Sequence, residues 1–90
     1  MALIFRGKSQ CVLCGEVLHL DDAIVTTSPF IEDDSHPLYE YADAGMHKTC
    51  FLGWEKRESF IRTFNQYFEK HYRGLRHMTE DGEILERELQ

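Results

Sequence analysis

Cysteine, proline and long apolar runs are all scarce in this 90-residue chain, which has three cysteines and two prolines. An odd number of cysteines argues against a disulfide framework, because such frameworks pair their cysteines. No stretch approaches the roughly 20 apolar residues of a membrane-spanning helix. The apolar run near the N-terminus, residues 3–5, is too short for a secretory signal. We therefore expect a protein with reduced thiols, located in the cytoplasm and without a membrane segment.

Basic residues are also few, with ten Lys and Arg against 16 Asp and Glu, and the formal net charge is -6. A chain of this charge repels phosphate backbones unless its basic residues gather on one face. Most of them fall within residues 48–76, whereas acidic residues crowd positions 32–43 and 80–88. Mixed charges on helices usually form a solvated face. Nucleic-acid binding is therefore an alternative and not the first hypothesis.

The cysteines that are present combine with one histidine into a ligand pattern. The pattern is C-x2-C followed much later by H-x2-C, and its members are Cys11, Cys14, His47 and Cys50. Structural zinc sites are closed tetrahedra of four thiolate or imidazole ligands, with no position left for water or substrate. We predict one structural zinc ion, held by these four residues. His19 and His36 stay open as replacements for one ligand.

A redox role for the C-x2-C pair is another competing interpretation, beside a disulfide framework and a chance occurrence of the pattern. A thioredoxin-like motif needs a helix that starts at the cysteines within a βαβ unit, whereas residues 16–20 alternate in polarity like a strand. A domain this small has only a modest core, and structural zinc supplies about 10 kcal/mol or more of folding free energy in small zinc-folded peptides. We expect a single zinc-binding domain over residues 1–90, with a zinc core over 10–73, a tail over 75–90 and metal-dependent folding.

Hydrophobic patterning and turn residues predict an α+β fold in which β-hairpins precede one long helix. The expected strands and loop are, in order, a short strand within 1–9, a hairpin of 16–20 and 23–31, a loop over 32–37 and a strand over 38–41. We expect the helix over residues 44–72, with Asp43 as its N-cap and Gly74 as its stop. The Asp81-Gly82 pair predicts a small tail hairpin, with a short acidic helix over 83–90 as the alternative.

The expected helix carries one apolar stripe with steps of three and four residues. Its members are His47, Cys50, Phe51, Trp54, Ile61, Phe64, Phe68 and Tyr72. Leu52, Phe60 and Tyr67 lie off this stripe. Apolar residues at helical spacing are usually core, which favours packing of these three under residues 1–9 or 75–90. If the protein has a partner surface, we predict that it includes these three, because an aromatic-rich band makes a good binding anchor.

This order of elements resembles the treble-clef zinc fingers: a cysteine-pair turn comes first, then a hairpin, then a helix whose first turn supplies the second ligand pair. The resemblance covers residues 10 to about 60 and implies one zinc site but no reaction. LIM and RING proteins bind two zinc ions with eight ligands, so this chain resembles at most a single such module. The HNH nucleases, a further group of this kind, need a histidine and an asparagine before the helix. His36 is the faint match for that histidine, but the sole asparagine is Asn65, so a nuclease is the least favoured interpretation.

The leading functional hypothesis is a non-enzymatic interaction module stabilised by zinc, such as a small adaptor, regulator or immunity-like protein. The acidic pairs at residues 21–22, 33–34 and 80–81 are typical of turns and not of catalytic carboxylates. An acidic surface with apolar anchors suits a protein partner with a basic surface, and a homodimer is an alternative. The second hypothesis is nucleic-acid binding through residues 48–76, with Tyr67, Tyr72 and Arg73 as contacts.

Overall fold

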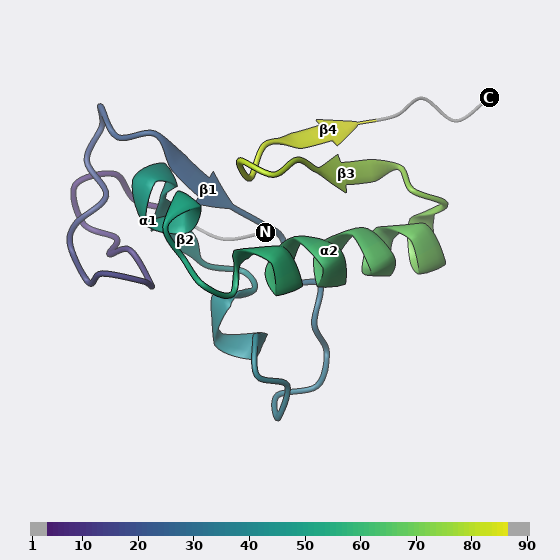
Figure 1. The fold of residues 1–90 in the computed structure, drawn as a ribbon. Coiled ribbons are helices and arrows are strands. Elements are labelled where there is room, and N and C mark those ends of the chain that lie inside the picture. The colour runs from purple at the N-terminus through teal and green to yellow at the C-terminus, as the bar shows by residue number, and fades with distance from the viewer. Residues whose placement is uncertain (1–3, 87–90) are drawn as a thin grey trace.

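A computed structural model describes residues 4–86 of the chain (Figure 1). The elements are, in order, β1 (Ile24–Thr26), the 3-10 helix η1 (Tyr39–Tyr41), β2 (Gly45–His47), α1 (Lys48–Leu52), α2 (Arg57–Tyr72), β3 (Arg76–Met78) and β4 (Ile84–Glu86). β1 pairs with β2, and β3 pairs with β4, both antiparallel. Two short antiparallel sheets and one long helix confirm the predicted α+β class.

The cysteine pair lies in a tight turn closed by an isolated bridge between Gln10 and Val17. The Cys11 N–H donates to the Glu16 carbonyl at 2.8 Å, and Gly15 takes a left-handed φ of 80° that favours glycine. Residues 4–9 form turns and irregular backbone in place of the expected first strand, whose residues 1–3 lie outside the described part of the chain.

The predicted hairpin of residues 16–20 and 23–31 is wrong, because β1 pairs instead with a later segment. Ile24 lies opposite His47, and Thr26 opposite Gly45. Residues 16–20 are already engaged, since the Leu18 N–H donates to the Ser9 carbonyl and the Leu18 carbonyl accepts from Gly7. The strand predicted over residues 38–41 is wrong as well: short i to i+3 hydrogen bonds form η1 there.

The long helix begins later than predicted and is preceded by a separate short one. His47 has an extended backbone with φ -62° and ψ 139°, because it ends β2, and α1 then stops at Gly53. α2 starts at Arg57, so Asp43 does not cap it. α2 ends at Tyr72, and both Arg73 and Gly74 take left-handed backbone angles. The stop predicted at Gly74 is therefore confirmed.

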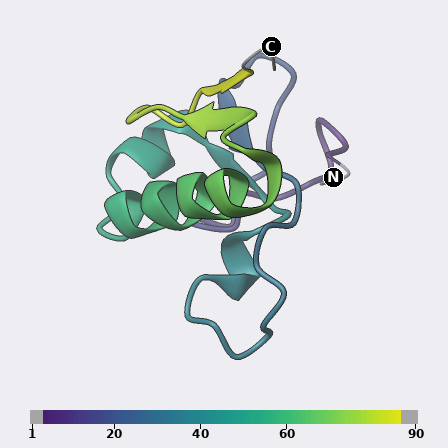
Figure 2. The same cartoon turned by 90° about the vertical axis from the view of Figure 1, so that its right-hand side faces the viewer.

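The predicted tail hairpin is present, and it packs along α2. The Thr79 N–H donates to the Glu83 carbonyl at 2.8 Å, which closes a three-residue loop between β3 and β4, and Gly82 takes the left-handed position in it with a φ of 86°. Asn65 of α2 holds the hairpin at Met78: its Oδ1 accepts from the Met78 N–H at 2.7 Å, and its Nδ2 donates to the Met78 carbonyl at 3.2 Å. The segment with η1 extends from the opposite side of α2 (Figure 2).

The core gathers aromatic side chains from α2 and the loop after β1. Phe30 makes edge-to-face contacts with Phe60 and Phe64, each with ring centroids 5.2 Å apart. Phe60 is 0% exposed, so the prediction that it faces a partner is wrong. The break between α1 and α2 shifts the helical phase, and Phe60, Phe64 and Phe68 form one inward stripe at steps of four. None of the helices in residues 4–86 is long and apolar enough to cross a membrane.

Candidate metal centre

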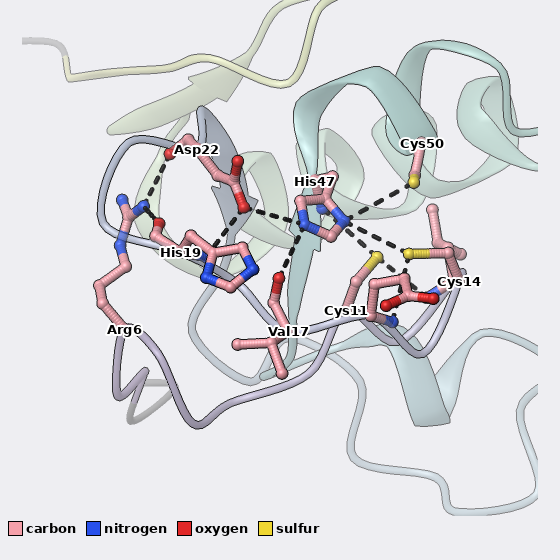
Figure 3. Close-up of polar contacts among 10 residues, drawn as sticks. Arg6, Cys11, Cys14, Val17, His19, Asp22, His47 and Cys50 are labelled. Atoms are coloured by element: carbon pink, nitrogen blue, oxygen red, sulfur yellow. Dashed lines mark hydrogen bonds and ion pairs between the residues drawn. The ribbon is translucent and has the colours of Figure 1, made fainter.

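The four predicted ligands converge at one place (Figure 3). Cys11 and Cys14 come from the tight turn, His47 from the junction of β2 and α1, and Cys50 from the first turn of α1. Their ligand atoms all lie within 4.8 Å of one another. Among residues 4–86 this is the one group of three or more potential ligands, and it contains neither His19 nor His36. The cluster could hold a metal ion.

Backbone amides point at the sulfurs. The Leu13 and His47 N–H groups donate to Cys11 Sγ, and the Glu16 N–H donates to Cys14 Sγ, all at 3.4 Å. Amide donors of this kind stabilise negative charge on a thiolate, which is the form of cysteine that binds metals. The pKa of Cys11 follows this pattern: burial raises it, but hydrogen bonds from the backbone amides of His47, Cys14 and Leu13 and from the Cys14 side chain together lower it by more, to about 7.

The ring of His47 turns its Nδ1 toward the sulfurs. Nδ1 lies 3.4 Å from Cys14 Sγ and 3.8 Å from Cys50 Sγ. Tetrahedral zinc, with bonds of about 2.3 Å to sulfur and 2.0 Å to nitrogen, places such atoms about 3.5 Å apart. The observed separations bracket that value. Nδ1 is therefore the ring nitrogen positioned to bind a metal ion.

Two ligands retain protons at neutral pH when no cation is bound. Burial lowers the pKa of His47, but its contacts with the sulfurs of Cys14 and Cys11 raise it by more, to about 9. Burial raises the pKa of Cys50 to about 11, and the neighbouring sulfurs of Cys14 and Cys11 add to this effect. Crowded sulfurs thus disfavour a further negative charge. A divalent cation at their centre would replace these protons and remove the repulsion.

Three sulfurs and one imidazole nitrogen form a soft donor set. Zinc accepts such donors, whereas magnesium and calcium prefer oxygen. Comparison with known protein families, curated proteins and solved structures gave no match. The site is therefore interpreted from its own chemistry. Cys11 is 2% exposed, Cys50 and His47 are half-buried, and Cys14 is exposed, so the cluster lies at the edge of the core.

Sequence reasoning missed Asp22 and Arg6, which lie behind the ligands. The Asp22 carboxylate Oδ2 is 3.2 Å from Nε2 of His47, and it also accepts a hydrogen bond from the His19 N–H at 2.8 Å. Arg6 donates to the carbonyls of His19 and Asp22, both at 2.7 Å. The sequence predicts only a turn at Asp22. No spacing rule links it to His47, 25 positions away.

Proposed function

We propose that this chain binds one structural zinc ion through the Cys11, Cys14 and Cys50 sulfurs and Nδ1 of His47. The convergence of four soft donors from two segments far apart in the sequence supports this most directly. All four positions of a tetrahedron are then filled by the protein, which leaves none for substrate. The zinc would hold the fold together and perform no reaction.

We further propose that the zinc-binding half is a treble clef. The chain order is that of this group: a cysteine turn, the paired strands β1 and β2, and a helix that carries the second ligand pair. The Val12 N–H donates to the Gly45 carbonyl at 3.0 Å, and the Lys48 N–H to the Ala23 carbonyl at 2.9 Å. These bonds tie the turn to β2 and β1 to α1, so the two ligand pairs are already close.

The function proposed for this domain is protein–protein interaction, as a small adaptor, regulator or immunity-like protein in a reducing compartment such as the cytoplasm. Support comes from the acidic balance and from apolar side chains at the surface. Leu52 and Tyr72 are 43% and 47% exposed, and Tyr67 is half-buried beside Tyr72, with ring centroids 5.9 Å apart. Leu52 and Tyr67 therefore stay in the proposed partner surface, and Phe60 leaves it. A second copy of the chain is the alternative partner.

Metal analysis of the purified protein tests the zinc site, and the expected result is one zinc per chain. A folded protein with a zinc content near zero would refute it. The interaction role is tested with Leu52→Asp, using Ser59→Asp as a matched control that adds the same charge at an exposed polar position. Leu52→Asp should fold, bind zinc and lose its protein partner or its self-association, while Ser59→Asp keeps them.

Nucleic-acid binding is the second candidate, because Arg62, Arg76 and His77 line one groove of about 430 Å³ between α2 and β3. Two observations weaken it: Glu69 lines the same groove, and Arg76 pairs with Glu86 at 3.6 Å. Binding to phosphates would weaken steeply with salt, whereas an apolar protein contact would not. Submicromolar, salt-sensitive binding of DNA or RNA that Arg62→Ala abolishes would reverse the order of the two candidates.

A further inference from the structure

The ring of His47 is held at both of its nitrogens. While Nδ1 faces the sulfurs, Nε2 lies 3.2 Å from the Val17 carbonyl oxygen and 3.2 Å from Oδ2 of Asp22 (Figure 3). The His47 side chain is 15% exposed and that of Asp22 33% exposed. Water therefore competes little at the histidine and only in part at the carboxylate.

Both groups behind the ring are acceptors, which fixes the position of the ring proton. A neutral imidazole carries one N–H, and the other nitrogen has the lone pair that binds a metal. With a carbonyl and a carboxylate facing Nε2, the proton belongs on Nε2 and the lone pair on Nδ1. A carboxylate in this position also makes the metal-bound nitrogen a stronger donor.

Asp22 is held in place by contacts outside the ligand cluster. Its Oδ2 accepts from the His19 N–H, and Arg6 clamps the same turn through the carbonyls of His19 and Asp22. A residue that only closed the turn would need the His19 contact alone. The same oxygen also lies within hydrogen-bond distance of a ring that points into the ligand cluster, 25 positions along the chain.

The geometry points to Asp22 as a positioning residue of the metal site, which holds His47 in the tautomer that leaves Nδ1 free to bind the ion. This role rests on the proposed zinc site. It predicts that Asp22 affects zinc affinity through His47 and not merely through the shape of the turn.

Chelator competition against wild-type protein gives the first test. Outer partners of ligating histidines contribute about 10- to 100-fold in metal affinity. We expect Asp22→Ala to bind zinc about tenfold more weakly, at the lower end of that range because the Val17 carbonyl remains as an acceptor. The matched control is Asp21→Ala, which removes the same charge from an exposed neighbour and should keep wild-type affinity. Equal affinities for both variants would overturn the assignment.

A double-mutant cycle separates positioning from turn formation. His47→Cys supplies a sulfur ligand in place of the imidazole, so Asp22 has no ring to orient. Asp22→Ala should then weaken zinc binding by less than about twofold in the His47→Cys background, against about tenfold in wild type. A similar loss in both backgrounds would show that Asp22 acts only on the turn.

Histidine ring NMR of the zinc-loaded wild type needs no variant to fold. The expected spectrum has Nδ1 of His47 bound to metal and a slowly exchanging proton on Nε2, whose exchange accelerates in Asp22→Asn. Binding through Nε2 would overturn the inference while leaving the zinc site intact. Wild-type protein that takes up no zinc would instead refute the proposed site and the role of Asp22 with it.

Discussion

The molecule has two ends that are held together by different chemistry. The metal end, residues 10–26 and 45–52, has the short strands β1 and β2, an exposed turn and four converging metal-ligand candidates. The aromatic end consists of Phe30, α2, β3 and β4, and apolar packing on one face of a helix of 16 residues holds it together. A sheet of two strands with three residues each, such as β1 and β2, buries too little apolar area to be stable alone. The metal end therefore depends on its ligands, and the aromatic end on its core.

The two ends meet at Phe51, which follows the ligand Cys50 and is 0% exposed. Its ring packs against Phe60, with centroids 6.1 Å apart. Gly82 of the tail turn also lies close to Phe51: a Cβ at this position would lie 2.7 Å from a Val25 methyl and 3.0 Å from the Phe51 ring. Unfolding of one end should thus destabilise the other.

Removal of the proposed zinc ion should have the largest effect. Cys50→Ser, or excess chelator, deletes a term of order 10 kcal/mol from a domain whose apolar core supplies only a few kcal/mol of net stability. We expect both ends to lose cooperative unfolding together, as followed by circular dichroism melting. An unchanged cooperative transition after complete metal removal would show that the aromatic end folds independently.

Phe60→Asp tests whether the fold also depends on the core of the aromatic end. Phe60 is fully buried among Phe30, Phe51 and Trp54, and an unpaired carboxylate there should destabilise the fold by several kcal/mol. The variant should therefore unfold even with zinc in excess, whereas the control Ser59→Asp stays folded. Urea denaturation measures both. A stable Phe60→Asp protein would restore Phe60 to the partner surface.

Lowering the pH should weaken zinc binding at the metal end. With pKa values of about 9 for His47 and about 11 for Cys50 in the metal-free cluster, both groups are protonated near neutral pH and must release protons when zinc binds. Zinc affinity should therefore fall as the pH falls, by about tenfold per released proton for each pH unit. Chelator competition at several pH values measures the slope, and a pH-independent affinity would contradict the ligand set.

Asn65→Ala should loosen the hairpin from α2 without touching the metal. The change removes both hydrogen bonds to Met78, whose own side chain is 1% exposed, and should lower the free energy of unfolding by about 1–3 kcal/mol. Zinc affinity should be unchanged. Gln66→Ala, at the exposed neighbouring position, is the control and should stay within about 0.5 kcal/mol of wild type in urea denaturation.

His36→Ala should have the smallest effect. His36 accepts one hydrogen bond from the Leu38 N–H at 3.0 Å, in the loop before η1, and it lies outside the ligand cluster. Its loss should cost about 1 kcal/mol or less and leave one zinc per chain. A large drop in zinc content, measured by metal analysis, would mean that the cluster has a different fourth ligand.

The most local signals in the sequence were the most reliable. The spacing of the cysteines and His47 singled out residues that the fold brings together, and Asp81-Gly82 marked a hairpin because the turn depends only on contacts within residues 79–83. The helix was harder to predict. Its periodic pattern continued through residues 44–56, where pairing of β2 with β1 keeps the chain extended up to His47.

The sequence by itself thus determined the donor set, the α+β class and the tail turn, because each depends on residue type and short spacing. Only the tertiary structure decided that Phe60 is core, since its direction depends on where α2 restarts after Gly53. It alone also placed Asp22 behind His47. Both outcomes depend on contacts between segments far apart in the chain, which no periodicity or motif in a single sequence records.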